Sequence, residues 1–252
     1  MVSRHFRLPG YGQPDTVAFV MIEVGPYKFT EGDIETTIFA APHLLDGYPA
    51  RAQAELAGLR AEFAQAIETS PPEEAVQKIF PRLLAEARAA VERAEALPET
   101  ATGSVVQLNV SQGGVPKTPV DSVEVGFSGL EADSQNDRKH HGRPFQALCL
   151  WSEEIIEQLK ADGHPIYAGA AGENVTIRGI DWTTLEPGTN IAIGSTLVQI
   201  SSYAVPCGKQ AQWFSDRDVR RLHHGNGEIS RLYATVIEAG SISVGDEVTV
   251  EP

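Results

Sequence analysis

The stretch that decides the fold is NIAIGSTLVQIS, residues 190–201, in which two short apolar and β-branched runs flank a turn pair. Asn190–Ile193 and Thr196–Ser201 have the length and composition of β-strands. Gly194 and Ser195 between them are residues that favour turns. The stretch therefore predicts two short strands separated by a tight turn.

Similar segments recur on both sides of this stretch after Gly103. The further predicted strands are Ser104–Val110, Ser122–Val125, Gln146–Leu150, Asn174–Ile177, Tyr233–Glu238 and Glu247–Val250. Many short strands at this spacing favour an all-β sandwich or barrel over an alternating βαβ pattern. One helix interrupts the series, because Ser152 is a good N-cap before the acidic pair Glu153 and Glu154.

The first hundred residues have a different character. Between Tyr48 and Ala96 apolar residues recur at helical spacing, which predicts two amphipathic helices separated near Ser70, with a kink or late start at Pro81. Two upstream runs, Thr16–Val24 and the weaker Glu35–Ala40, are read as strands. We therefore expect an α-rich (α+β) region over residues 1–100, a linker, and a mainly β domain over residues 103–252.

The charge of the chain limits its partners. Its 252 residues carry 20 Lys and Arg against 34 Asp and Glu, a net charge of -14. Such a surface disfavours nucleic acid and anionic membranes, which attract positively charged proteins. The two cysteines are too few for a disulfide framework, and no run of 18 apolar residues or export signal is present. We expect a cytoplasmic protein without a membrane segment.

Basic residues cluster in the β-rich part despite the acidic composition. Eight of its eleven Lys and Arg lie in two stretches plus one outlier: Arg138, Lys139, Arg143; Lys209, Arg217, Arg220, Arg221; and Arg231. If the fold brings these stretches together, they form a cationic pocket for a phosphate or another oxyanion. The alternative is that each stretch is an ordinary solvated loop.

The two cysteines have different surroundings. Cys207 lies between Pro206 and Gly208, which places it on a turn, and the nearby Lys209 favours the reactive thiolate form. Cys149 lies in an apolar run and is expected to be a small core residue. Cys207 is therefore the candidate nucleophile or metal ligand, although a structural thiol is an equal alternative.

Two histidine pairs accompany the basic stretches, His140-His141 and His223-His224. Adjacent histidines point in different directions and lack zinc-site spacing, so hydrogen bonding or proton transfer is the preferred role. The sequence Gly172-Glu173-Asn174 follows small residues and is read as a loop that faces a site or holds a turn. No Walker loop, dinucleotide fingerprint, GxSxG or CxxC motif occurs, which argues against the corresponding chemistries.

Several of these segments, in this order, resemble the MOSC domain, the C-terminal domain of molybdenum cofactor sulfurases, and most closely its free-standing bacterial type. The segments are Ser111–Lys117, Gly129–Asp133, Asp137–Pro144, Ala147–Leu150, Gly172–Asn174, Pro206-Cys207 and Gly240–Val250. The resemblance covers residues 103–252. It departs from the family at Ala132, where a glycine is common before the aspartate.

The resemblance implies a β-barrel with small helices that binds the molybdenum cofactor, a pterin that carries a phosphate. It implies an oxidoreductase that reduces N-hydroxylated compounds, with Cys207 as molybdenum ligand and His140 or His141 as proton donor. The expected cofactor-binding residues are Lys117, Arg138, Arg143, Glu173, Asn174, Lys209 and Arg221. A soft thiolate suits the metal, and basic residues suit the phosphate.

The resemblance leaves two alternatives open. Cys207 would bear a persulfide in a sulfur-carrier protein, although residues 1–100 do not match the transferase domain that supplies sulfur in the sulfurases. Otherwise the pocket has been recruited for different chemistry. The substrate is expected to be a small molecule, and electrons would come from a separate reductase because no flavin, haem or iron–sulfur motif is visible. The N-terminal region would shape substrate choice or serve in homo-oligomerisation.

Overall fold

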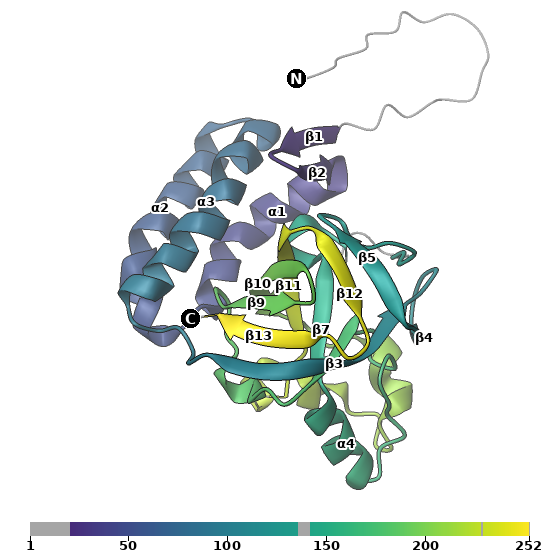
Figure 1. Ribbon diagram of the computed structural model, residues 1–252. Coiled ribbons are helices and arrows are strands. Elements are labelled where there is room, and N and C mark those ends of the chain that lie inside the picture. The colour runs from purple at the N-terminus through teal and green to yellow at the C-terminus, as the bar shows by residue number, and fades with distance from the viewer. Residues whose placement is uncertain (1–20, 136–141, 228, 252) are drawn as a thin grey trace, which may run out of the picture.

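The computed structural model of the protein contains a closed β-barrel with a helical layer beside it (Figure 1). The structure describes residues 21–135, 142–227 and 229–251. Within this part, seven strands form a ring in the order β13-β9-β10-β11-β7-β8-β3, and β3 closes it by pairing with β13. The predicted β-barrel with small helices and an α-rich N-terminal region is confirmed.

The ring strands agree closely with the predicted segments. They are β3 (Ala101–Val110), β7 (Leu148–Ser152), β8 (Val175–Arg178), β9 (Asn190–Ile193), β10 (Thr196–Tyr203), β11 (Leu232–Glu238) and β13 (Glu247–Glu251). Thr196 pairs with Ile193 across the turn, so the opening stretch is an antiparallel hairpin. Side chains that point inward from these strands, such as Ile191, Val198 and Val236, are fully buried and form the barrel core.

Every pairing in the ring is antiparallel except that of β7 with β8. Parallel neighbours need a crossover connection. Here the connection contains α4 (Glu153–Ala161), whose N-cap Ser152 accepts a hydrogen bond from the amide of Ile155 as predicted. The return segment, residues 162–174, ends at Asn174 beside β8 and supplies part of the site described below.

Short strands lie outside the ring. β4 (Thr118–Val120) pairs with β3, and β12 (Gly240–Ser243), β5 (Ser122–Gly126) and β6 (Gly129–Leu130) form a small separate sheet. Of these, β5 was predicted. β4 and β6 are too short to leave a clear pattern in the sequence, and β12 was missed because it has a single apolar residue, Ile242.

From residue 21 on, where the description of the N-terminal region begins, it contains a hairpin and three α-helices. The elements are β1 (Met21–Val24), β2 (Tyr27–Thr30), α1 (Glu31–Leu44), α2 (Gln53–Thr69) and α3 (Pro72–Arg93). The expectation of a strand at Glu35–Ala40 is wrong, because this segment lies inside α1. Thr30 and Asp33 form a capping box that starts the helix, and packing of Ile34 and Ala41 outweighs the β-branched composition.

The helical layer contacts the barrel through specific bonds and shared core. The Tyr27 hydroxyl donates to the carbonyl of Val236 at 2.7 Å, and Arg88 Nη1 donates to the carbonyl of Gly188 at 2.8 Å. Phe145 from the barrel side packs into the same apolar cluster as Phe80 of α3. These contacts fix β2 and α3 against the barrel.

Among the residues described, no helix combines the length and apolar character that a bilayer crossing requires.

Candidate functional site

Two cavities meet at Cys207. The narrow cavity, of about 80 Å³, is lined by polar residues that include Lys117, Asn174 and Arg231. The wide cavity, of about 900 Å³, lies between the barrel and α1. Four residues line both cavities: Gln146, Cys207, Lys209 and Tyr233. The thiol that the sequence singles out therefore stands at the junction of the two spaces.

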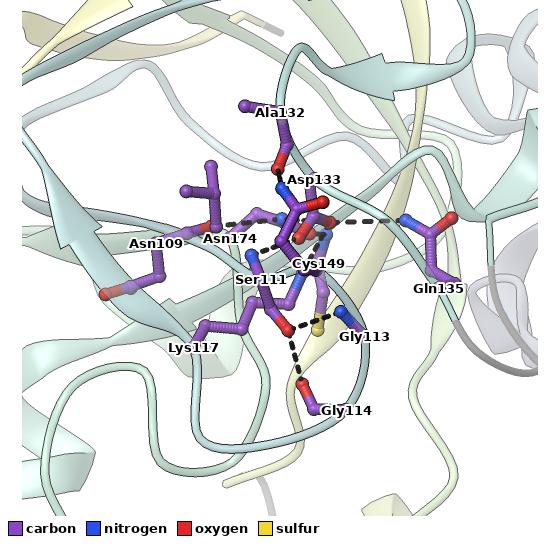
Figure 2. Close-up of polar contacts among 12 residues, drawn as sticks. Asn109, Ser111, Gly113, Gly114, Lys117, Ala132, Asp133, Gln135, Cys149 and Asn174 are labelled. Atoms are coloured by element: carbon purple, nitrogen blue, oxygen red, sulfur yellow. Dashed lines mark hydrogen bonds and ion pairs between the residues drawn. The ribbon is translucent and has the colours of Figure 1, made fainter.

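A buried carboxylate organises one wall of the narrow cavity (Figure 2). Asp133 Oδ2 accepts from Lys117 Nζ at 2.5 Å, Asn174 Nδ2 at 3.0 Å and Gln135 Nε2 at 3.2 Å. Its other oxygen accepts from the amide of Ser111 at 2.8 Å. The Asp133 side chain is 1% exposed, so these donors replace the water that a carboxylate otherwise requires.

Asn174 joins three segments that are distant in the sequence. Its side-chain oxygen accepts from the amide of Cys149 at 3.1 Å, and its Nδ2 also donates to the carbonyl of Asn109 at 3.3 Å. Because Asn174 directly precedes β8, it fixes the start of the parallel β7–β8 pair beside β3. This predicted residue lines the narrow cavity.

Glu173, unlike the adjacent Asn174, does not line the narrow cavity. Its Oε1 accepts from the amide of Gly169 at 2.5 Å, whereas its Oε2 has no hydrogen-bond partner among the described residues. Burial raises the pKa of this carboxyl. The side chain stabilises the Gly169–Gly172 turn through its bond to the Gly169 amide, and it does not line either cavity.

Gln210 hydrogen-bonds both to the backbone of Cys207 and to the turn that contains Ala171. Cys207 follows β10 at the start of a short 3-10 helix, Gly208–Trp213, and its amide donates to Gln210 Oε1 at 3.1 Å. Gln210 Nε2 in turn donates to the carbonyl of Ala171 at 2.7 Å. Arg231 Nη1 donates to the same carbonyl at 2.7 Å. One peptide oxygen thus joins the cysteine loop, the Gly169–Gly172 turn and the segment before β11.

Two residues of the narrow cavity were not predicted to belong to a site. Arg231 appeared only as an outlier of the basic stretches, yet it is buried and lines the cavity. Cys149 is buried as predicted, but it also lines the cavity, and Arg231 Nη1 lies 3.8 Å from its Sγ. Burial raises the pKa of the Cys149 thiol, an effect that the Arg231 charge opposes.

The predicted basic residues occupy different places. Lys209 lines both cavities, and Arg143 lines the wide cavity, where its guanidinium lies 5.6 Å from the centre of the Phe145 ring. Arg221 is on neither wall, because it pairs with Asp216 and lies over Phe214. Arg138, His140 and His141 lie outside the described residues.

The residues present fit a cofactor that brings its own metal. Within the described residues, no group of three or more His, Cys, Asp or Glu could hold a bare ion. The narrow cavity instead offers a single accessible thiol, two lysines and one arginine. Arg231 Nε and Gln146 Oε1 are buried and have no hydrogen-bond partner in the part of the chain that the structure describes, so the wall contains a donor and an acceptor for a ligand.

A glycine widens the same wall. Gly172 has a φ of +92°, and a Cβ there would lie 2.8 Å from Val115 Cγ1 and 4.0 Å from Arg231 Nη1. A larger residue would therefore be strained and would crowd the cavity. The glycine in the Gly169–Gly172 turn therefore leaves space beside Arg231.

The barrel part of the chain contains a segment that matches a known domain family. Residues 137–249 match the family model described as the MOSC domain, which confirms the resemblance seen in the sequence. The chain is 32% identical to Protein YiiM of Escherichia coli (strain K12), over 46% of this chain and 53% of that protein. It is 28% identical to the uncharacterized protein YflK of Bacillus subtilis (strain 168), over 52% of this chain and 60% of that protein.

A solved structure with the same fold is described as the crystal structure of an hypothetical protein. It aligns with a TM-score of 0.50 and 24% identity, over 60% of this chain and 69% of that chain. The chain thus spans only a little over half of the length of the curated relatives that it matches. The family model begins at residue 137, so α1, α2 and α3 lie outside the matched segment.

Proposed function

We propose that the protein binds the molybdenum cofactor where the two cavities join at Cys207, with the phosphate of the cofactor in the narrow cavity, and reduces N-hydroxylated compounds. The observation that carries the proposal is the position of Cys207, a partly exposed thiol at the junction of a small cationic cavity and a larger open one. Because the narrow cavity has a volume of only about 80 Å³, the rest of the cofactor and the substrate would share the wide cavity beside this sulfur.

The residues of the narrow cavity would hold the cofactor by charge and hydrogen bonds. Arg231 and Lys209 supply positive charge for the phosphate, whereas the ammonium of Lys117 is already paired with Asp133. Arg231 also has a free buried Nε donor for this purpose. Cys207 would contribute a thiolate, which suits a molybdenum centre.

When bound, the cofactor supplies two electrons for cleavage of the N–O bond. The overall reaction takes two electrons and two protons, converts a hydroxylamine into an amine and releases water. The chain must therefore admit protons and receive electrons from a separate donor. The predicted proton donors His140 and His141 belong to the segment that precedes Gly142 and Arg143, both of which line the cavities.

Metal analysis and activity of the purified full-length protein test this proposal. We expect molybdenum to copurify and N-hydroxylated substrates to be reduced with a chemical electron donor. Cys207→Ala should lose the activity, because it removes the metal ligand. Cys149→Ala is the matched control, since it removes the buried thiol of the same cavity and should retain more of the activity.

Unchanged metal content and activity in Cys207→Ala would refute the proposal. The position of Cys207 beside open space also suits a sulfur carrier, in which the thiol must be reached by a partner. Absence of molybdenum, together with a mass increase of one sulfur atom on Cys207 after incubation with a cysteine desulfurase, would support that function instead.

A further inference from the structure

The wide cavity has a wall that the family match does not include. On one side lie Phe39, His43 and Leu44 of α1, and on the other lie Tyr203 and His224 of the barrel part. The cavity continues to Cys207, which it shares with the narrow cavity. A molecule with one end at Cys207 would therefore extend along α1.

The position of α1 is fixed by its opposite face. Ala41 of α1 and Leu45, the residue that directly follows α1, are fully buried in the core of the helical region. Residues 39, 40, 43 and 44 recur at helical spacing on the face that lines the cavity. The wall is therefore a preformed surface on a packed helix.

Apolar side chains are exposed on both sides of this cavity. Phe39 is 76% exposed and Val205, on the opposite wall, is 66% exposed. Of the five large apolar side chains that are exposed in the described residues, these two share one cavity. Single exposed apolar residues need no explanation, but two in one cavity gain free energy when a ligand removes both from water.

Flat rings contribute much of the wall. The rings of Tyr203 and His224 are stacked, with their centroids 4.7 Å apart and their planes at 12°. The ring centroids of Phe39 and His43 are 6.0 Å apart. Desolvation, with a contribution from His223, lowers the pKa of His224, which favours the neutral form of its ring. These surfaces favour contact with an apolar, flat group.

We propose that α1 forms the specificity wall of the substrate cleft, where Phe39 contacts the apolar ring of a substrate whose N–O group lies at Cys207. This inference rests on the proposed function for the reacting end of the substrate, but the ring contact itself requires no cofactor. Phe39 is the specificity-determining residue, because it is the most exposed apolar side chain on the wall and contributes little to the fold.

A pair of probe ligands isolates the ring contact. Benzohydroxamic acid and acetohydroxamic acid carry the same N–O group and differ in phenyl against methyl. Calorimetric titration of the full chain should show tighter binding of the phenyl compound. Phe39→Ala should weaken its binding by about three- to tenfold, with less than a twofold change for the methyl compound. Phe39→Tyr should restore the preference.

The control variant is Tyr167→Ala, which removes an exposed aromatic side chain outside both cavities and should leave both affinities unchanged. Equal affinities of the two probes for the unmodified protein, or an equal effect of Phe39→Ala on both, would overturn the inference. Failure of the molybdenum experiment would leave this binding result intact, and loss of ring selectivity would leave the molybdenum result intact. The two proposals therefore fail separately.

Discussion

The two cavities that meet at Cys207 differ in how their walls are built. The narrow cavity is lined by buried polar groups that hydrogen-bond to one another, centred on Asp133 and Asn174. The wide cavity is lined largely by rings and exposed apolar side chains, such as Phe39 and Val205. The polar residues around the narrow cavity are connected by hydrogen bonds, whereas the wide cavity is lined by side chains that, in the described part of the chain, do not form such a network.

Because of this difference, the walls of the two cavities tolerate amino-acid substitution to different degrees. A residue in the polar network cannot be replaced without leaving a buried partner unsatisfied. An exposed side chain on α1 can be replaced at little cost to folding. The residues around the narrow cavity therefore tolerate few substitutions, whereas the α1 wall of the wide cavity tolerates them.

The largest effect is expected when the network is broken at its centre. Asp133→Ala would leave Lys117 buried without its carboxylate and remove an acceptor from Asn174. We expect the free energy of unfolding to fall by about 3–5 kcal/mol in urea titrations. Glu157→Ala, which breaks an exposed pair with Lys160, should cost less than about 1 kcal/mol. Equal effects of the two variants would contradict the buried network.

A smaller effect should separate the two thiols. Cys149 is buried with a raised pKa, whereas Cys207 is partly exposed. Iodoacetamide at pH 8 should therefore label Cys207 more than about tenfold faster, as measured by peptide mass spectrometry. Labelling of Cys149 should increase only above the usual thiol range. In urea the two should react alike, and faster labelling of Cys149 in the native protein would refute the assignment.

The smallest effect concerns the residue before Asp133. Ala132 has a φ of +64°, a conformation that costs a residue with a Cβ about 1–2 kcal/mol. Ala132→Gly should raise the free energy of unfolding by up to about 1 kcal/mol, because the extra freedom of glycine in the unfolded chain offsets part of the gain. Ala64→Gly, on the exposed face of α2, should lower it by a similar amount. A loss of stability in Ala132→Gly would contradict the strained backbone.

The barrel was predictable because its signals are local. Each of the eight predicted strands after Gly103 overlaps an observed strand, since turn residues bound short β-branched runs. The segment Glu35–Ala40 was misread because Thr36, Thr37 and Ile38 favour strands in isolation, whereas the cap at Thr30 and the core decide for a helix.

The site was predictable only in part, because burial and pairing depend on the whole fold. Cys207 could be found from its turn. Arg221 shows why charge clustering is a weaker guide: the carboxylate of Asp216 and the main-chain carbonyl of Asp218 occupy its guanidinium locally. Arg231, in contrast, looked isolated, and only the fold reveals its contact with the carbonyl of Ala171.

The closure of the barrel between β3 and β13 has a consequence for synthesis of the chain. These strands are more than a hundred residues apart, so the ring cannot close on the ribosome until residues 247–251 have emerged. The helical region is complete long before that and can fold first. A nascent chain that stalls before residue 247 would expose an open sheet edge at β3 and β9, which is the kind of surface that chaperones recognise.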